Sequence, residues 1–474
     1  MMSGDAETEI GSEENSEERI APTYSLDREI SRYVQQEILT NSQPTLDVYP
    51  GTAPIEYDYI GERQNPHSTN LIEATAHLVK GCLGAGLLGI HEAFMHGGIW
   101  TSLAATLVVG VIVPYTMLML VQSAQRMYLM IRVPRLSYPD LAEAALATGP
   151  VKKLRRFSKV FRYTVDACLF IEMCGSCCLF EIMIARTLKQ VLEAVSSEIK
   201  ELNMSLRMYI LITSVPLLCV CMIRSLKFMA PLSLAAYLFI MLCVCATLFY
   251  SISLKKNITE RPKWKSFQGL FRFLGTCFYS IHGIPIALPL ENSMKSPKHF
   301  ITVLQCGMSA VLFLIAAVGF IGYWGFGEDC QTPITMHIPI LTETLVIPFL
   351  VAFMMAITFA LQFWVTFRII WAYVGRCHKR NRGIWQRFYR AIHVVLISGV
   401  AIAFPKVNFM MTFLGAVFCA FVGFIFPAFI ESLVTWREDR RKRVRWRLFK
   451  NILLVFFGST VCGMTLYSCK FEKW

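Results

Sequence analysis

The chain has 474 residues, and 55% of them are hydrophobic. Its mean hydropathy is +0.48 and its formal net charge is +13. Apolar runs of membrane-spanning length recur along it, so the composition excludes an ordinary soluble protein and predicts an all-α polytopic membrane protein. The positive charge does not indicate nucleic-acid binding, because Lys and Arg cluster at the ends of the apolar runs. In that position they report membrane topology.

Residues 1–66 carry clustered Asp and Glu, scattered Pro and Ser, and few large apolar residues. This composition is typical of a disordered acidic tail. No apolar signal segment precedes the first membrane-length run, so we expect that run to act as the insertion signal and to leave the N-terminus in the cytosol. Residues 67–474 are then predicted to form the transmembrane domain.

Eleven apolar runs predict about eleven transmembrane helices. They cover 71–94, 99–123, 163–187, 208–223, 229–253, 269–290, 301–325, 343–374, 388–405, 410–434 and 451–469. With a cytosolic N-terminus, the loops richest in Arg and Lys, after runs two, eight and ten, face the cytosol as the positive-inside rule requires. Asn203 and Asn257 begin N-x-S/T sequons in loops that this topology places outside, so we predict that both are glycosylated. The basic residues around Lys256 disagree with the charge rule.

The first apolar run, LIEATAHLVKGCLGAGLLGIHEAF, contains Gly81, Gly84, Gly86 and Gly89 in its middle. Each glycine costs a helix interior about 1 kcal/mol relative to alanine, so the pattern predicts a helix broken near mid-membrane. Unwound backbone at that depth is tolerated where it is buried in protein or lines a wet cavity, which indicates a binding site with N–H groups free to hold an anion.

This stretch also fits two other patterns. Residues 84–89 satisfy the dinucleotide-binding pattern G-x-G-x-x-G, but the strand, the soluble sheet and the acidic residue that this motif needs are missing. The small residues are also compatible with close helix packing alone.

The sixth run carries His282-Gly283-Ile284-Pro285, and Pro289 follows one turn later. Proline removes a backbone donor and clashes with the preceding turn, so this helix is also predicted to break. Interrupted helices at corresponding places in two halves indicate a 5+5 inverted-repeat transporter with its substrate between the breaks. Runs one to five and six to ten would be the repeats.

The sequence predicts no catalytic, metal or cofactor site. Most of the sixteen cysteines lie in apolar runs without metal-ligand spacing, and no histidine pair completes a zinc set. No nucleophile and base are recognisable, and no phosphate-binding P-loop exists, so an ion gradient is the expected energy source. Ionisable residues within the runs are functional candidates: His77, Glu92, Asp166, Glu172, Glu181, Arg186, His282, Glu291 and Arg368. Glu181 and Arg186 are close enough in sequence to pair.

The stretch from His77 to Gly89, HLVKGCLGAGLLG, resembles the H-L-L-K-G-N-I-G-T-G-L-L-G of proton-coupled amino-acid transporters, a branch of the amino acid/auxin permease superfamily. Three further blocks agree: Cys177-Cys178 with Leu188 to Val191, Leu288 to Asn292 with Met294-Lys295, and Phe359 to Phe363. The resemblance covers residues 55–470 in order.

This resemblance implies a LeuT-like fold with broken helices 1 and 6, and proton-coupled symport of small neutral amino acids. His77 matches the histidine linked to proton coupling, and Gly81 to Gly86 match the unwound substrate-binding segment. The family usually has proline at His91, asparagine and threonine at Cys82 and Ala85, and glutamate at His282, so the substrate and the coupling ion stay open.

We therefore predict a substrate site with two sides. N–H groups of the first break, at Gly81, Cys82, Gly84, Ala85 and Gly86, would bind the amino-acid carboxylate. Carbonyl groups of the second break, at Ser280, His282, Gly283 and Ile284, would bind the amine. The membrane is the plasma membrane or that of late endosomes and lysosomes.

Three alternatives remain at this point. An amino-acid sensor would keep the pocket with little flux, and a transporter with altered ion coupling would share the fold. A channel is a weaker candidate, because no filter motif is present.

Overall fold

The computed structural model describes residues 30–32, 35, 57–63, 68–195, 204–223, 226–254, 256–338, 346–378, 381–436 and 441–470. These residues are helical throughout, apart from loops and one isolated parallel bridge between Thr69 and Met294. An all-helical arrangement satisfies the backbone polar groups inside each segment, which the hydrocarbon interior of a membrane requires.

The first repeat begins with a helix that is broken, as predicted. Helices α4 (Leu71–Cys82) and α5 (Ala85–Gly97) meet at an angle of 52°. The remaining long helices of this half are α6 (Ile99–Ile131), α9 (Ser158–Val195), α10 (Leu206–Cys221) and α11 (Leu226–Ser253).

The second repeat begins with another broken helix, α12 (Phe267–Ser280) and α13 (Ile284–Ser293). It continues through α14 (Phe300–Phe326), α15 (Val346–Val374) and α16 (Arg382–Ala403). Its last helix runs from α17 (Val407–Leu414) through two π-helical turns, Gly415–Cys419 and Phe421–Ile425, into α18 (Phe426–Thr435). Helix α19 (Arg441–Lys470) follows the two repeats.

Each of the eleven predicted runs contains helix, but the helix ends differ from the predicted ends. Helices α6 and α9 extend well past the runs 99–123 and 163–187. Within the described residues, eight helices are long and apolar enough to cross a membrane, or nine when α4 and α5 count as one span, and α10 is a shorter apolar helix. The count of eleven spans stays a prediction.

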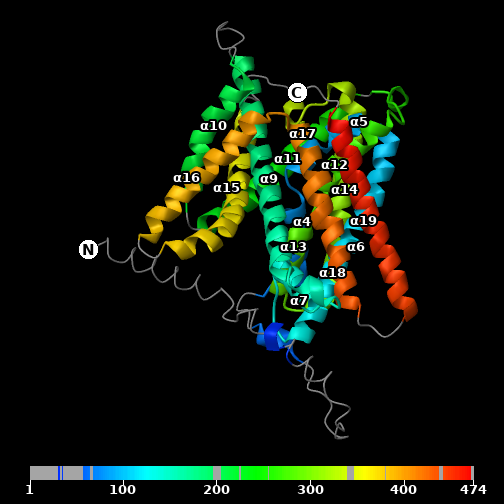
Figure 1. Cartoon of the computed structure of the whole chain (residues 1–474). Helices are drawn as coiled ribbons and strands as arrows, with labels where there is room; N and C mark the ends of the chain where they lie inside the picture. Colours follow the sequence, from blue (N-terminus) through cyan, green and yellow to red (C-terminus); the bar gives the residue numbers. More distant parts are fainter. Residues whose placement is uncertain are drawn as a thin grey trace, which may run out of the picture.

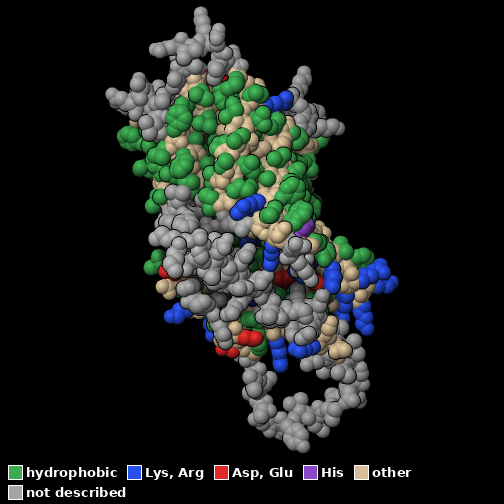
Figure 2. Space-filling view, turned by 90° about the vertical axis from the view of Figure 1, so that its left-hand side faces the viewer, with side chains coloured by type: hydrophobic (Ala, Val, Ile, Leu, Met, Phe, Trp, Pro, Cys, Tyr) green, Lys and Arg blue, Asp and Glu red, His purple; other side chains and the backbone are tan. Residues whose placement is uncertain are grey.

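The helices form a bundle (Figure 1). Helices α7 (Tyr138–Ala147) and α13 lie toward the lower end in this view, and α5 and α17 toward the upper end. Figure 2 shows hydrophobic side chains over the upper part of one face, with Lys and Arg gathered in the lower part. Phe249, Phe313 and Phe456 are each more than 70% exposed, as expected of side chains that face lipid.

Helix α7 confirms a short capped helix that the pattern Ser137-Tyr138-Pro139-Asp140 predicts. The Ser137 hydroxyl accepts a hydrogen bond from the Asp140 amide. Pro139 lies in the first turn, where a backbone N–H would have no acceptor within the helix, so the N–H that proline lacks is not missed. Most of its side chains are buried, against α9 and α18.

Ordered structure begins earlier than the predicted membrane domain. Helix α3 (Tyr59–Glu62) and Arg63 fall within the predicted tail of residues 1–66, yet Arg63 is only 3% exposed. Most of the tail, and Asn203, lie outside the described residues.

Candidate functional site

The first break lies at Leu83 and Gly84, between α4 and α5. The Tyr237 hydroxyl of α11 donates a hydrogen bond of 3.0 Å to the Leu83 carbonyl, which the broken helix leaves without a helical partner. Ala85 and Gly86 open α5, so their N–H groups have no acceptor within that helix. The predicted break is therefore confirmed, but the predicted unwound segment from Gly81 to Gly86 is longer than the observed one: Gly81 and Cys82 still belong to α4, and Ala85 and Gly86 to α5. The free N–H groups at the start of α5 are of the kind that holds anions in other helices.

The second break lies at Ile281, His282 and Gly283. Helix α12 ends at Ser280, and its last carbonyl groups have no helical donor, apart from that of Cys277, which accepts from the Ile281 amide. Pro285 stands in the first turn of α13, where its fixed φ suits a helix start.

The two breaks are in direct contact. A methyl group added to Gly86 would lie 2.5 Å from the Ser280 Cα, and one added to Gly283 would lie 2.4 Å from the Cys82 sulfur. Only glycine allows these approaches, so the predicted residues Cys82, Gly86, Ser280 and Gly283 meet at one place. The start of α5 and the end of α12 bring partial positive and partial negative charge there.

The side chains that line the first break are uncharged. Ala85 and Ile284 are 1% exposed, and the Cys82 thiol contacts the Met308 sulfur at 3.8 Å. Met117 lies beside Gly283. A ligand at this position therefore meets backbone dipoles and a small apolar surface.

His77 is not brought to the breaks. It lies on the exposed face of α4, which also carries Glu73, Gly81 and Gly84. Gly81 approaches Ile286 of α13, and a methyl group on it would lie 2.2 Å from the Ile286 Cδ1. His77 thus faces outward from α4, one turn before Gly81 and well short of the break at Leu83.

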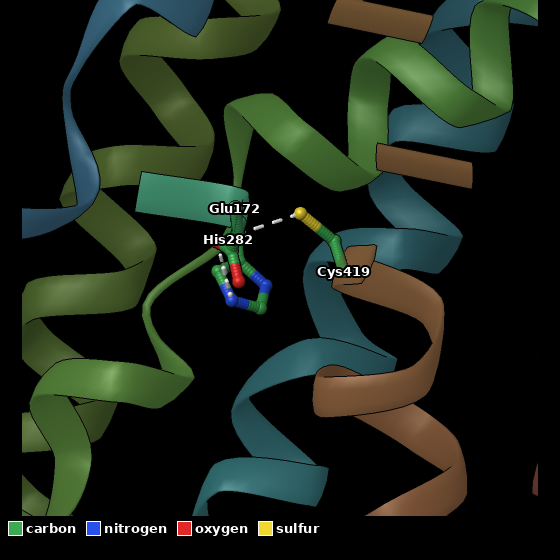
Figure 3. Close-up of side chains that lie close together, drawn as sticks. All are labelled: Glu172, His282 and Cys419. Atoms are coloured by element: carbon green, nitrogen blue, oxygen red, sulfur yellow. Dashed lines mark hydrogen bonds and ion pairs between the residues drawn. The ribbon is translucent and has the colours of Figure 1, made fainter. Parts of the chain in front are cut away.

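His282 turns toward two residues that sequence analysis did not connect with it (Figure 3). Its Nε2 atom lies 3.1 Å from the Glu172 Oε1 of α9, and the Cys419 thiol of the first π-helical turn lies 3.7 Å from the same oxygen. The ligand-type atoms of the three residues all lie within 4.8 Å of one another, the one such group among the described residues. No spacing in the sequence could have indicated this cluster.

The loop after α14, which contains the short helices Gly327–Asp329 and Ile334–His337, packs against α5 and α9. Thr332 donates to Glu92 of α5 at 2.5 Å and accepts from Arg186 of α9 at 3.1 Å through its carbonyl. A cavity of about 440 Å³ remains here, lined by Glu92, Arg186, Gln331 and five other residues. The loop thus links α5 to α9.

Two histidines hold the same backbone segment of that loop. His91 Nε2 lies 3.1 Å from the Gln331 carbonyl, and the Gln331 amide donates to His337 Nε2 at 3.1 Å. Burial lowers the pKa of His337 to about 4, despite the opposing charge of Asp329. His91 is one of the departures from the family pattern, and its structural role was missed from the sequence.

A buried ion pair joins Arg63 and Glu291, at 2.9 Å. Arg63 also donates to the Pro134 and Glu291 carbonyls, and Glu291 accepts from Gln125 and Tyr128. This network joins the segment before α4 to the ends of α6 and α13.

Glu181 and Arg186 take different partners. Glu181 accepts a hydrogen bond of 2.6 Å from Ser398, while Arg186 bonds to Thr332. These contacts do not support the pairing expected from their positions in the sequence.

The sequence from 67 to 469 matches the family described as transmembrane amino acid transporter protein. The chain is 30% identical over 424 residues to the proton-coupled amino acid transporter-like protein pathetic of Drosophila melanogaster, covering 88% of this chain and 87% of that protein. It is 24% identical over 380 residues to vacuolar amino acid transporter 3 of Schizosaccharomyces pombe, covering 78% of this chain and 54% of that protein.

Among solved structures, the inward-facing conformation of Mhp1 matches 90% of this chain and 95% of that one, with a TM-score of 0.56 and 10% identity. The fold is that of the LeuT-type transporters, with two repeats of five helices. The chain belongs to the transmembrane amino acid transporter family, which is the amino acid/auxin permease family, and is a transporter and not an enzyme.

Proposed function

We propose that this protein is a secondary active transporter that moves small neutral amino acids together with protons. The observation that carries the proposal is the contact between Gly86 and Ser280, which sets the start of α5 beside the end of α12. An amino acid has a carboxylate and an ammonium group a few ångströms apart. The two helix ends offer N–H donors for the first and carbonyl acceptors for the second.

The preference for neutral side chains follows from the surface beside the breaks. Cys82, Ala85, Met117 and Met308 carry no charge, so a charged substrate side chain directed toward these residues would be desolvated without a partner, away from the Glu172–His282 pair. A small apolar or hydroxyl side chain would avoid that cost.

Proton coupling is assigned to His77 by its match to the family pattern. Its exposed position on α4 supports exchange of a proton with water at the inner side. Histidine changes charge between an acidic compartment and a neutral cytosol, as Asp or Arg at their reference pKa values do not. Coupling requires that proton and substrate favour the same state of the broken helix. The Drosophila relative carries proton coupling in its name.

The proposed orientation places the N-terminus, Arg63 and α7 in the cytosol, because the basic loops lie at that end. The proposed membrane is the plasma membrane or that of an acidic organelle, and the vacuolar name of the yeast relative supports the second. Asn257, which is exposed, is the proposed glycan acceptor within the described residues, and Asn203 is the other.

The test is uptake of a panel of labelled amino acids into proteoliposomes, with and without an inward pH gradient. We expect accumulation of small neutral amino acids only with the gradient. Binding without flux would make the protein a sensor, and uptake that follows a different ion gradient would identify altered coupling.

A further inference from the structure

Glu172, His282 and Cys419 form a compact cluster inside the bundle (Figure 3). Each comes from a different element: α9, the second break, and the π-helical turn Gly415–Cys419. Glu172 is 6% exposed, Cys419 is fully buried, and the His282 side chain is 7% exposed. Three types of metal ligand therefore converge in a place that is largely closed to bulk water.

The distances within the cluster fit ligands around one tetrahedral ion. Zinc bonds of about 2.1 Å to oxygen and nitrogen and 2.3 Å to sulfur place neighbouring ligands about 3.4 Å apart for N and O and about 3.6 Å apart for O and S. The observed separations are 3.1 Å between His282 Nε2 and Glu172 Oε1, and 3.7 Å between Cys419 Sγ and the same oxygen. The remaining pair, His282 and Cys419, lies within 4.8 Å.

Two of these atoms lack the partners that buried polar atoms normally have. Glu172 Oε2 and His282 Nε2 are buried, and neither makes a hydrogen bond to a described residue. His282 Nε2 is near Glu172 Oε1 but is not aligned for a hydrogen bond with it. Leaving such groups unsatisfied is costly, more so for charged groups, and a bound cation would take the His282 Nε2 lone pair and offset the charge of the Glu172 carboxylate.

We propose that Glu172, His282 and Cys419 form a binding site for a zinc-like transition-metal ion. A carboxylate and a thiolate supply two negative charges, which neutralise a divalent ion in a low-dielectric interior. The thiolate and imidazole favour Zn²⁺ over Mg²⁺, Ca²⁺ or Mn²⁺, which prefer oxygen ligands. Three protein ligands leave the fourth tetrahedral position for water or another small donor.

Occupancy would connect parts of the fold that transport requires to move apart. The ion would link the second break to α9 and to the π-helical turn. This link would stabilise one conformation of the broken helix over the others. We therefore expect Zn²⁺ to slow transport. This consequence rests on the proposed function, whereas metal binding itself does not.

The binding test uses the purified full-length protein in detergent, titrated with Co²⁺ as a spectroscopic substitute for Zn²⁺. A thiolate bound to Co²⁺ gives a near-ultraviolet charge-transfer band, which we expect in the wild type and expect Zn²⁺ to abolish. Cys419→Ser should remove this band, and His282→Gln and Glu172→Gln should weaken Co²⁺ binding by at least about tenfold. Cys277→Ser, which removes another buried thiol, should leave the band unchanged.

The wild-type minus Cys419→Ser difference spectrum separates this site from the other cysteines. A difference spectrum without a charge-transfer band would overturn the proposal, as would equal weakening by Cys277→Ser. Uptake measured with and without Zn²⁺ then tests the consequence: the inhibition ratio should be large in the wild type and near one in Cys419→Ser. A wild type that binds Co²⁺ but transports no amino acid would contradict the proposed function and leave the metal site standing.

Discussion

Gly86 lies so close to Ser280 that a methyl group on the glycine would sit 2.5 Å from the serine Cα. The neighbour is backbone as well as side chain, so a rotamer change cannot relieve the clash. The two broken helices are therefore fitted to each other at the position where the proposed substrate binds.

Gly86→Ala should accordingly reduce uptake by more than tenfold, because the second break must shift to accept one added carbon, and about 1.4 kcal/mol in the transport barrier suffices for a factor of ten. Surface expression and the elution profile of the purified protein should stay close to wild type. Gly463→Ala is the matched control, since a methyl group there meets nothing within 4 Å. Equal uptake by Gly86→Ala and Gly463→Ala would remove the support for the site.

The buried Arg63–Glu291 pair predicts a large loss of stability when one partner is removed. Arg63→Ala leaves the Glu291 carboxylate buried without its counter-ion, which typically costs about 3–5 kcal/mol. Thermal unfolding in detergent, followed by tryptophan fluorescence, measures the effect. Lys189→Ala removes an exposed pair with Glu193 that is worth about 0.3–0.5 kcal/mol, so its midpoint should barely move. Similar unfolding midpoints for the two variants would contradict the stabilising role of the Arg63–Glu291 network.

The pKa of His337 predicts that acid weakens the docking of the loop after α14, residues 327–338. Burial holds this pKa near 4, below the reference value of about 6.5, so the docked loop keeps the imidazole neutral. The undocked histidine takes up a proton more readily, and docking is therefore fully favoured above pH 6.5 and is lost progressively as the pH falls toward 4. Protonation also removes the acceptor for the Gln331 amide.

Hydrogen exchange of residues 327–338 measures this docking when the wild type and His337→Gln are compared at the same pH. The two should exchange alike at pH 7, and the wild type should exchange faster at pH 5. His299→Gln replaces an exposed histidine outside this loop and is the control, so it should exchange like the wild type. Equal exchange of wild type and His337→Gln at pH 5 would refute the pH dependence.

The sequons predict glycans on Asn203 and Asn257. In a eukaryotic host, glycosidase treatment should increase electrophoretic mobility, and Asn257→Gln should remove part of the shift. Unchanged mobility after removal of both acceptors would contradict the proposed orientation.

The breaks could be predicted from the sequence because they depend on local chemistry. The glycines from Gly81 to Gly89 disfavour helix, and Pro285 stands where a helix must restart. The second interruption, about half a chain after the first, then indicated the two repeats. The helix ends were less predictable, since α6 and α9 continue beyond the apolar runs that would cross the membrane.

The side-chain clusters could not be predicted, because they depend on how distant helices pack. Glu172, His282 and Cys419 lie on three separate elements and share no spacing. The sequence around Arg63 has the composition of a disordered tail, yet Arg63 is buried and bonds to residues at the ends of α6 and α13. His91 contacts Gln331 in a loop far away in the sequence, and such a contact produces no periodic pattern from which it could be predicted.

The most direct test of coupled transport is proton entry into proteoliposomes that contain a trapped pH-sensitive dye. Adding a small neutral amino acid outside, without an imposed gradient, should acidify the interior of vesicles with the wild type. His77→Ala should lose this acidification while still binding the amino acid, and the Gly463→Ala control should keep it. Amino-acid uptake without any acidification in the wild type would contradict proton-coupled symport, and unchanged acidification in His77→Ala would remove His77 from the coupling mechanism.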